Sequence, residues 1–471
     1  MAYRDLREFI KALEAKNLIK WVDAEVDKDW EISAVQRVVS TMGDEKRHAT
    51  GFRNVKGYDI PVVTGVTGGS RGVYATALEM DDLTMDSVIA KWANALSNPV
   101  PTTIVSEGEC QEVVLTGDDV DLNKFPIPTW TYGLDPAPYI TAPCEITKDY
   151  NTGIQNMGTY RMQVKSRNTT GILWDLPSQH GAVHYAEWEK ANEPMPMAVA
   201  IGGDPTMMLS SVAKAPLGVD ELTVAGALRG ESMEVVKCKT IDIYVPAHAE
   251  IILEGTIEPY YREIEGPFGE YTGYMGGPYD LPLFKIQCIT HRKNPIYQGF
   301  HSQKPPSESS LIRQIPEEAA VYKHLVHQLK LPGIIDVHFP EAGGSYAMLW
   351  IRMDVKYHGH AKQVLSAAWC HHSSIAKWVI VTDADIDIRD QFSREWALSW
   401  RVEPIKDIFF IPDTAAIMLD PSNAPMEVAL WDRKSSKVCV DATKKWPYPP
   451  IGYPPKEHLD KVKAEWSKYG I

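Results

Sequence analysis

The chain has 471 residues, of which 44% are hydrophobic and 23% charged, so it is long enough for about two to four globular domains. A formal net charge of -14 argues against a nucleic-acid partner, because phosphate binding needs a basic surface. The six cysteines are scattered without a C-x-x-C pair, which is typical of reduced thiols and not of a disulfide framework or a zinc site.

The first part of the chain, residues 1–115, mixes helical and strand-like patterns and predicts an α/β domain. Its opening segment is charged and amphipathic, and it lacks the apolar core of a signal peptide. No apolar run approaches the roughly 18 residues of a membrane span, so we expect a cytoplasmic protein without a membrane partner. The apolar residues at helical spacing near the start are Leu6, Phe9, Ile10 and Leu13. The other expected elements are helices over 27–42 and 85–96 and a strand over 58–69.

From about residue 118 onward, prolines break up any long helix and short apolar runs alternate with turn residues. Many short strands at close spacing, with one helix over 184–193, predict a β-barrel-like domain over 116–305. The expected strands cover 158–164, 197–203, 233–245, 250–255 and 282–290.

Residues 306–471 return to alternating helix and strand and predict a second α/β domain. Pro316 is expected at the first position of a helix that ends near Gln328. The proline- and aromatic-rich stretch 445–455 is expected to extend over a neighbouring surface before a short final helix. The other expected elements are strands over 333–339, 346–353 and 377–382 and helices over 360–368 and around 396–400.

Several motifs have an ordinary structural interpretation beside a functional one. The acidic run Asp383–Asp387 fails as a calcium loop because Ile388 and Arg394 stand where Gly and Glu are needed, which leaves a solvated loop or a ligand site at a strand end. The pairs at 358/360 and 371/372 are surface or cap histidines, or metal ligands without convincing partners. Phosphate-binding glycine motifs and a G-x-S-x-G nucleophile motif are absent from the sequence.

The stretch EGPFGE at 265–270 places two carboxylates across a Gly-Pro-Phe-Gly turn. It is either a solvated hairpin tip or a pair of acids presented to a ligand. Two acids held close together cannot both ionise easily, so one of them can act as a proton donor, and an arginine would hold the other as a carboxylate. Composition alone leaves both interpretations open, because periodicity cannot supply the arginine.

Three separated stretches resemble motifs of the UbiD family of prenylated-FMN-dependent decarboxylases. They are EGPFGEYTGY at 265–274, NMGTYRMQV at 156–164 and PSQH at 177–180. Further stretches similar to the family are AYRDLREFI near the start, DELTVAGALRG (220–230), EVVKCKTIDIYVPAHAEIILEG (234–255) and KWVIVTDADID (377–387). The resemblance spans nearly the whole chain in the same order.

The resemblance implies roles for particular residues. Arg161, Glu265 and Glu270 would form the Glu-Arg-Glu network, with Glu270 as the proton donor and Glu265 paired with Arg161. A divalent metal, Mn²⁺ or Mg²⁺, would be held against the cofactor phosphate by Asn156, His180 and Glu221. A K⁺ ion would use Glu221 and the backbone around Ser210 and Ser211. The remaining implied residues are Gln179 beside the flavin, Lys377 near the phosphate, and Ile315 and His301 in the substrate pocket.

The resemblance also implies the architecture: an N-terminal α/β domain, a central FMN-reductase-like split β-barrel and a C-terminal α/β domain for oligomerisation and pocket closure. The implied reaction is reversible non-oxidative decarboxylation of an aromatic, heteroaromatic or α,β-unsaturated acid, with CO₂ as co-product. The implied partners are a flavin prenyltransferase as cofactor supplier and further copies of the chain, as a dimer or hexamer. Two alternatives are a flavin-binding subunit of a larger aromatic carboxylase complex and a plain FMN oxidoreductase, although a nicotinamide signature is missing.

Overall fold

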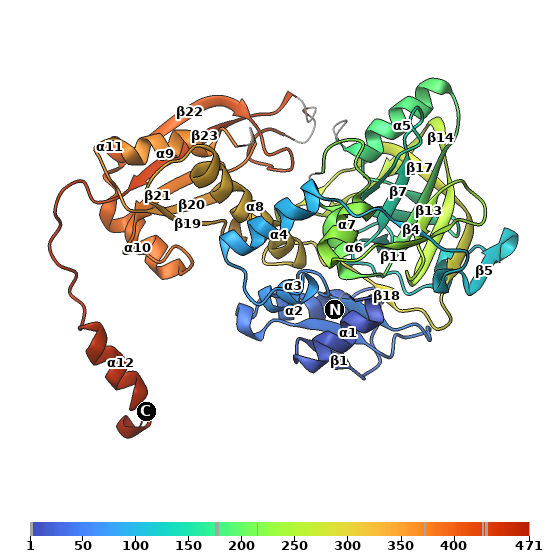
Figure 1. Ribbon diagram of the computed structural model, residues 1–471, viewed down its shortest axis with the longest axis horizontal. Coiled ribbons are helices and arrows are strands. Elements are labelled where there is room, and N and C mark those ends of the chain that lie inside the picture. Colours follow the sequence, from blue (N-terminus) through green and yellow to red (C-terminus); the bar gives the residue numbers. More distant parts are fainter. Residues whose placement is uncertain are drawn as a thin grey trace.

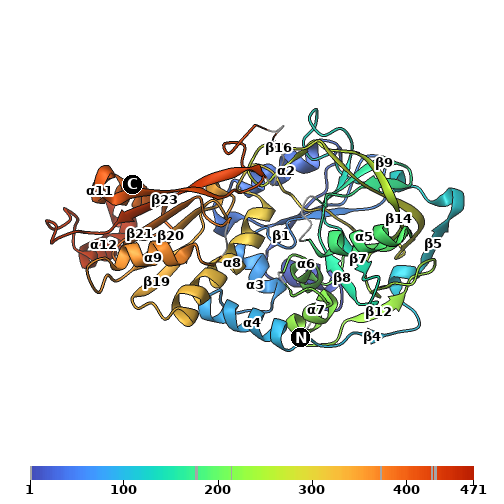
Figure 2. The same cartoon turned by 90° about the horizontal axis from the view of Figure 1, so that it is seen from above.

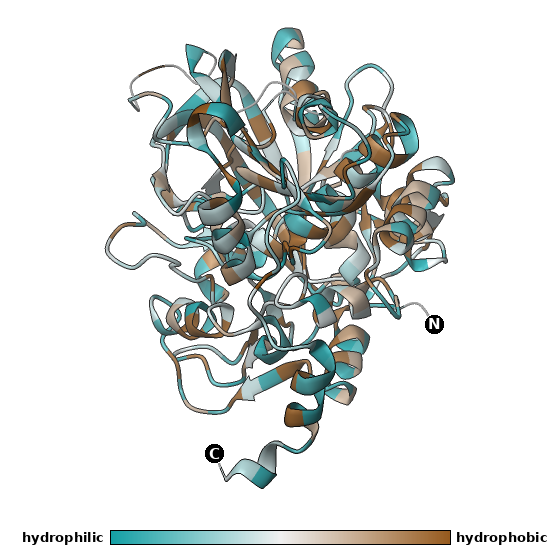
Figure 3. Ribbon diagram, turned by 90° about the vertical axis from the view of Figure 1, so that its left-hand side faces the viewer, coloured by the Kyte–Doolittle hydropathy of each residue, from teal (hydrophilic) through white to brown (hydrophobic). Residues whose placement is uncertain are grey.

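The computed structural model describes residues 3–174, 179–213, 215–371, 374–425, 428 and 432–470. Along the chain it forms an N-terminal α/β part, a large central sheet with its helices and a C-terminal α/β part (Figure 1). This order confirms the expected fold class. Figure 3 shows hydrophobic residues gathered along the interior strands and the inner sides of the helices. Within the described ranges, no helix is long and apolar enough to cross a membrane.

The N-terminal part is a small sheet of strand order β1-β2-β3-β18 covered by helices. Its elements are α1 (Leu6–Ala15), β1 (Ile19–Val22), α2 (Glu31–Ser40), β2 (Ala49–Phe52), β3 (Val62–Thr64), α3 (Arg71–Ala77), α4 (Met85–Ser97) and β18 (Tyr297–Gln298). The predicted apolar face of α1 is buried, and the Asp5 carboxylate caps the helix by accepting from the Glu8 backbone N–H.

Two N-terminal elements are shorter than predicted. The helix expected over 27–42 begins only at Glu31, because the Asp27 side chain accepts from the Asp29 backbone N–H and stabilises a turn instead. The strand expected over 58–69 is reduced to β3, because Gly65 takes a left-handed φ of 73° and ends the extended backbone.

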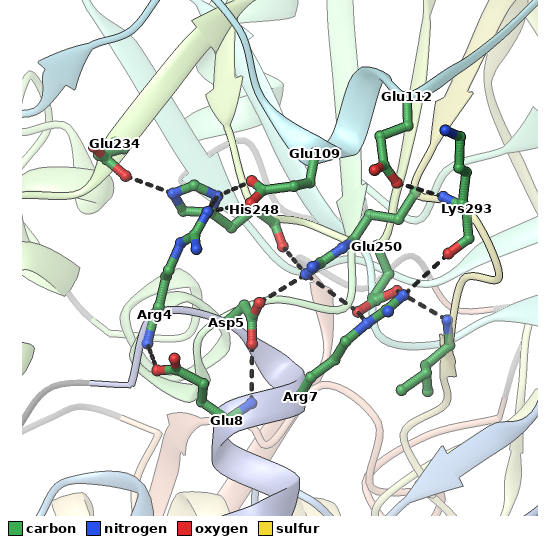
Figure 4. Close-up of polar contacts among 12 residues, drawn as sticks. Arg4, Asp5, Arg7, Glu8, Glu109, Glu112, Glu234, His248, Glu250 and Lys293 are labelled. Carbon is green, nitrogen blue, oxygen red and sulfur yellow. Dashed lines mark hydrogen bonds and ion pairs between the residues drawn. The ribbon is translucent and has the colours of Figure 1, made fainter.

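Buried ion pairs tie α1 to the central part (Figure 4). Both oxygens of Glu250 accept from the Arg7 guanidinium at 2.8 Å, and Glu250 is fully buried. Arg292 donates to Asp5 at 2.7 Å, so the carboxylate that caps α1 also holds this arginine. Because bidentate arginine–carboxylate pairs fix orientation, these contacts set the position of the N-terminal part against the barrel.

The central part is a nine-stranded sheet of order β6-β9-β10-β17-β14-β11-β7-β8, with β5 also paired to β17. Its strands are β5 (Val113–Thr116), β6 (Tyr139–Ile140), β7 (Cys144–Lys148), β8 (Gln155–Gly158), β9 (Met162–Ser166), β10 (Thr169–Gly171), β11 (Met195–Ile201), β14 (Ile251–Glu265) and β17 (Tyr279–His291). Helices α5 (His180–Ala191), α6 (Pro205–Ser211) and α7 (Glu221–Arg229) accompany the sheet. The sheet is curled, and it carries the residues of the candidate site.

Three central predictions need correction. The strand expected over 158–164 is interrupted, because β8 ends at Gly158 and residues 159–161 form the turn before β9 begins at Met162. The single strand expected over 233–245 is two strands, β12 (Glu234–Lys237) and β13 (Tyr244–Pro246), which pair with each other across a turn. Of the two, β12 also pairs with β4 (Thr103–Ile104). The strand expected over 250–255 continues to Glu265 as the long strand β14, which pairs with β17 up to Tyr279. Between these two ends the chain makes a separate small hairpin of β15 (Phe268–Gly269) and β16 (Met275–Gly276). The stretch 265–270 is therefore not a simple hairpin tip.

The C-terminal part is a five-stranded sheet of order β19-β20-β21-β23-β22, in which β20, β21 and β23 are parallel. Its elements are α8 (Glu308–Tyr322), β19 (Ile334–His338), β20 (Met348–Met353), α9 (His360–Ala368), β21 (Trp378–Asp383), α10 (Gln391–Arg401), α11 (Pro404–Asp407), β22 (Ile408–Ala415) and β23 (Lys434–Ala442). Helix α8 packs against both α4 and β19 and so joins this sheet to the rest of the molecule (Figure 2).

The start of α8 was predicted wrongly. Pro316 lies inside the helix, which begins at Glu308 behind a capping box formed by Ser307 and Ser310. A proline inside a helix removes one backbone hydrogen bond. Here the helix continues through it because the side chains on its inner face, such as Leu311 and Ile312, are buried.

The C-terminal tail runs away from the body of the molecule (Figure 1). The stretch 449–458 is exposed throughout, and the final helix α12 (Lys456–Ala464) has no buried residue. The final helix was predicted, but the expected cover by a neighbouring surface is not provided by the described part of this chain.

Candidate active site

Arg161, Glu265 and Glu270 come together in the central part. The Arg161 guanidinium donates to both oxygens of Glu265, from Nε at 3.0 Å and from a terminal nitrogen at 2.8 Å, and its other terminal nitrogen donates to Glu270. Glu265 is 0% exposed, whereas Arg161 and Glu270 are 8% and 9% exposed. The sequence places Arg161 104 residues before Glu265, and the sheet closes that gap.

The strands of the central sheet bring Arg161 and Glu265 together. Arg161 lies between β8 and β9, and Glu265 is the last residue of β14, so both stand where strands of one sheet end. A Cβ atom at Gly171 would lie 2.9 Å from the Glu265 Cγ, so the glycine leaves the room that this side chain occupies. The Arg161 Cζ also lies 5.2 Å from the centre of the Phe268 ring, in the turn that separates the two glutamates.

The electrostatics of the trio keep the arginine charged. Burial alone lowers the pKa of Arg161, but the neighbouring Glu270 and Glu265 outweigh it and hold this pKa above its ordinary value. The guanidinium thus stays a cation at any physiological pH and orients two carboxyl groups. Three charge-assisted hydrogen bonds in a buried place make this trio rigid.

A surface pocket opens beside Glu270. Central residues form most of its wall, and the C-terminal part contributes the rest. Its lining residues are Glu270, Thr272, Tyr274, Met275, Gly276, Tyr279, Leu419, Pro421 and Arg433. Glu265 does not line this pocket, so of the two glutamates Glu270 is the one that a ligand can approach.

A second polar cluster joins Asn156, His180 and Glu221. His180 and Glu221 are the first residues of α5 and α7, and both helix starts face Asn156 on β8. The His180 Nδ1 lies 2.9 Å from Asn156 Oδ1 and 3.5 Å from Glu221 Oε1, and Glu221 accepts from the Met157 backbone N–H at 2.7 Å. Burial raises the pKa of Glu221 to about 7 and lowers the pKa of His180.

The chemistry of this cluster fits a divalent cation. With Asn156 Oδ1 facing inward, three acceptor groups converge: the amide oxygen, the imidazole nitrogen and the Glu221 carboxylate. If the amide is turned by 180°, its nitrogen donates to Glu221 at 3.1 and 3.2 Å and satisfies the cluster without a cation. An O/N/O donor set of this kind suits Mn²⁺ or Mg²⁺. Among the described residues no group of three His, Cys, Asp or Glu has the geometry of a metal site, and this cluster supplies only two such residues beside its asparagine.

Ser210 and Ser211 end α6 close to this cluster. The Ser211 Oγ lies 2.5 Å from Thr159 Oγ1 and donates to the Met208 carbonyl, and the Ser210 Oγ donates to the Met207 carbonyl. Gln179 immediately precedes α5 as its N-cap residue. Pro177 and Ser178 of the same motif lie outside the described residues.

Other predicted site residues are placed elsewhere. Lys377 donates to the Asp420 carboxylate at 2.9 Å and to Ser422, so its described contacts lie within the C-terminal part. Ile315 is 3% exposed in the hydrophobic core beneath α8. His301 is fully buried, with Nε2 at 3.0 Å from Gln303 Oε1, and burial lowers its pKa to about 4.

The acidic run 383–387 and His360 have structural contacts. Arg401 donates to Asp383 at 2.7 Å and to Asp385 at 2.8 Å, so the acidic run after β21 is an internal ion-pair network. His360 is buried at the start of α9 and accepts from the Lys356 backbone N–H, which makes it a structural histidine and not a surface one. His372 lies outside the described residues.

Sequence reasoning missed several residues beside Glu270. Asp135 accepts from two backbone N–H groups, and Gln303 joins His301 to Trp130 and Thr131. The proline-rich stretch that contains Asp135 was interpreted only as helix-breaking. A carboxylate four or five residues after two consecutive loop amides was the one available signal, and many surface turns share it.

Comparison with known proteins supports one family over the whole chain. The N-terminal, Rift-related and C-terminal domain models of 3-octaprenyl-4-hydroxybenzoate carboxy-lyase, UbiD, match residues 10–92, 103–305 and 310–442. The UbiD-class enzyme HmfF from Pelotomaculum thermopropionicum, solved in complex with FMN, is 35% identical with a TM-score of 0.85, over 98% of this chain and 99% of that one.

Two further solved structures agree with this match. Vanillic acid decarboxylase (ShVdcCD) from Sedimentibacter hydroxybenzoicus, in its open form, is 31% identical with a TM-score of 0.82 over 100% of both chains. The 3,4-dihydroxybenzoic acid decarboxylase AroY from Klebsiella pneumoniae is 25% identical with a TM-score of 0.85 over 98% of this chain and 99% of that one. Identity above 30% over the full length, together with three family models in order, shows that this chain belongs to the UbiD family of carboxy-lyases.

Proposed function

We propose that this enzyme decarboxylates an aromatic or heteroaromatic acid reversibly and without net oxidation, with prenylated FMN as its cofactor. The proposal extends to an α,β-unsaturated acid, because its carboxyl group is likewise bonded to an sp² carbon. The observation that carries the proposal is the Arg161–Glu265–Glu270 trio, in which one carboxyl group is locked by the arginine and the other lines a pocket.

The two glutamates have different roles in this proposal. Glu265 uses both carboxylate oxygens on Arg161 and is fully buried, so it serves as the permanent counter-charge of the guanidinium. Glu270 takes one Arg161 N–H and lines the pocket, so it is the acid that delivers a proton to the carbon that has lost CO₂. In the reverse direction the same carboxylate accepts that proton.

A flavin is needed because loss of CO₂ from an sp² carbon leaves an electron pair that no amino-acid side chain can accept. Prenylated FMN supplies that electron sink when it is bound. HmfF was solved with FMN, and an evolved dimeric form of it was solved with prFMN. Both support a flavin site in the matching central part of this chain.

The Asn156–His180–Glu221 cluster would hold the divalent cation, Mn²⁺ or Mg²⁺, that neutralises the cofactor phosphate. Its acceptor atoms converge, and two helix N-termini face it, which also favours an anion nearby. Backbone carbonyls around Ser210 and Ser211, with Glu221, would hold K⁺. Gln179 would line the flavin because it stands directly before His180.

Lys377 is proposed to reach the phosphate, which requires its contacts with Asp420 and Ser422 to open.

His301 is the proposed partner of a substrate hydroxyl. Its tautomer follows from its neighbour: Gln303 donates through its nitrogen to the Trp130 carbonyl at 2.6 Å, so its oxygen accepts from His301 Nε2–H. The His301 Nδ1 is then a buried acceptor without a hydrogen-bond partner among the described residues.

The test is co-expression with and without a flavin prenyltransferase, followed by cofactor mass measurement and CO₂ release from a panel of aromatic and heteroaromatic acids. Glu270→Gln is expected to keep bound flavin and to lose at least about 100-fold in turnover, as is typical of a missing general acid. Glu263→Gln, in the same stretch of chain, is the matched control and is expected to keep full activity. Full turnover in Glu270→Gln contradicts the assigned role.

We also propose that the enzyme works as an oligomer of identical chains. The tail at 444–470 carries six lysines against three acidic residues, whereas the chain as a whole has a net charge of -14. Trp446, Tyr453 and Trp466 in this tail are 65%, 73% and 51% exposed. A basic, aromatic tail without cover fits the acidic surface of a second copy.

The alternative is a flavin-binding subunit of a larger carboxylase complex, for which the two-component name ShVdcCD is the observation in favour. Light scattering on the full chain and on a chain ending at residue 444 separates the two. A drop from oligomer to monomer on truncation supports self-assembly. A monomer in both cases, with activity only after a second polypeptide is added, supports the subunit alternative.

A further inference from the structure

The loop from residue 129 to 135 is closed by its own carboxylate. Asp135 Oδ2 accepts from the backbone N–H groups of Trp130 at 3.0 Å and Thr131 at 2.6 Å. In return, the Thr131 carbonyl accepts from the backbone N–H groups of Leu134 and Asp135, at 3.0 and 2.9 Å. Removing this carboxylate would leave two loop amides without their acceptor.

The closed loop is then joined to Gln303. The Gln303 side-chain nitrogen donates to the Trp130 carbonyl at 2.6 Å and to Thr131 Oγ1 at 2.9 Å. Ser33, on α2, also donates to the Trp130 carbonyl. Three segments that are distant in sequence therefore meet at one backbone group, and the loop has little freedom to shift.

The loop 129–135 and Gln303 together contact Gly269, the residue before Glu270. A Cβ atom at Gly269 would lie 3.2 Å from Thr131 Oγ1 and 3.6 Å from Gln303 Cγ, so the backbone of Gly269 lies directly against both side chains. Tyr139, the first residue of β6 and four residues after the loop, contacts the turn before Glu270: its hydroxyl donates to the Pro267 carbonyl at 3.2 Å, and the centre of its ring lies 4.4 Å from that of Phe268.

We propose that Asp135 is a positioning residue for Glu270, acting through Thr131 and Gln303 on Gly269. The inference rests on the proposed role of Glu270 as the proton donor. A proton donor must lie within hydrogen-bond reach of its carbon, and a misplacement of about 1 Å can cost roughly 100-fold in rate. Asp135 interacts with the Arg161 guanidinium through charge, and its hydrogen bonds to the Trp130 and Thr131 amides reach the site through the loop.

Charge gives the same residue a pH dependence. Burial raises the pKa of Asp135 to about 6, although two backbone N–H groups and the nearby charge of Arg161 lower it. The titratable groups near this loop include Arg161, Tyr139, Glu265 and His301, Asp29, which accepts from Thr129 Oγ1 at 2.8 Å, and Glu270, which is bonded to Arg161. Because this pKa is raised, the folded loop favours the protonated carboxyl, and ionisation above about pH 6 costs folding free energy that the two amide hydrogen bonds only partly offset.

The experiment compares Asp135→Asn, Asp135→Ala and the exposed-loop control Asp119→Asn in the flavin-loaded enzyme. Asp135→Asn keeps an acceptor oxygen for the two amides, so kcat is expected within about threefold of wild type. Asp135→Ala is expected to lower kcat by about 10- to 100-fold with KM within threefold and flavin content unchanged. Asp119→Asn is expected to behave as wild type.

A readout that does not depend on activity is hydrogen exchange of the peptide spanning 265–276, which is expected to exchange faster in Asp135→Ala than in wild type. Wild-type kcat and wild-type exchange in Asp135→Ala overturn the inference. If Asp135→Ala fails to fold, Thr131→Val is tested in its place, because this variant loses only the hydrogen bond to Gln303. An unchanged kcat in Thr131→Val overturns the inference, and a kcat lowered three- to tenfold supports it. Full turnover in Glu270→Gln overturns the proposed function instead, which keeps the two failures apart.

Discussion

Replacing Arg161 by methionine should destabilise the central part of the enzyme strongly, with or without a bound flavin. The change removes three hydrogen bonds and leaves Glu265 and Glu270 buried without their cation. Breaking a buried ion pair by removing one partner typically costs about 3–5 kcal/mol. Because the pKa of Arg161 is raised, the stabilisation that this residue provides is fully present below its ordinary pKa, and the loss is expected at every pH from 5 to 9.

The assay is thermal unfolding of the flavin-free protein at pH 7.5, followed by far-ultraviolet circular dichroism. At roughly 2 °C or more per kcal/mol for large domains, a loss of about 3 kcal/mol lowers the midpoint by roughly 6 °C or more. Arg167→Met is the matched control: its partner is Asp118, both side chains are largely exposed, and such pairs contribute about 1 kcal/mol at most. A midpoint within 2 °C of wild type in Arg161→Met would refute the buried trio.

Three further outcomes are expected. Gly171→Ala should lower turnover at least about tenfold and lower the unfolding midpoint, because the new Cβ would lie 2.9 Å from Glu265 Cγ; kinetics and thermal unfolding on one preparation check this. His180→Ala should lower bound manganese, measured by elemental mass spectrometry, to less than about a tenth of wild type. The pKa of His301 is lowered to about 4, so the stability that it provides is present above about pH 6.5 and is lost as pH falls toward 4. Stability measured at pH 7.5 and 5 should therefore fall less in His301→Asn than in wild type.

Much of the fold could be predicted because periodic burial and capping are local signals. The apolar face of α1 and the buried strand β21 follow directly from the spacing of their apolar residues. The predictions of element boundaries failed where a contact with a segment distant in sequence sets the boundary. Helix α8 continues through Pro316 because its inner face is buried, and β14 is long because β17 pairs with it up to Glu265. The domain limits 1–115, 116–305 and 306–471 stay a prediction.

The candidate site was accessible from sequence only through the family resemblance. Glu265 and Glu270 are close in sequence, but a turn of this composition is common on protein surfaces, and Arg161 reaches them only across the sheet. The groups proposed to support Glu270 left only a weak sequence signal: Asp135 accepts from the backbone N–H groups of Trp130 and Thr131, and Gln303 donates to the Trp130 carbonyl. Contacts of this kind depend on how three separate segments pack, and no local pattern encodes them.

The two polar clusters share one short stretch of chain, and this sets their relative position. Asn156 belongs to the Asn156–His180–Glu221 cluster, and Arg161, five residues further along on the turn from β8 to β9, belongs to the carboxyl trio. Between these two residues, Thr159 Oγ1 lies 2.5 Å from Ser211 Oγ, so a hydrogen bond connects the middle of the turn to the end of α6. If the proposed cation anchors the cofactor and Glu270 is the proposed proton donor, this one turn fixes the distance between anchor and acid. A substitution at Thr159 is therefore expected to disturb both clusters together, whereas one at Gly171 disturbs the trio alone.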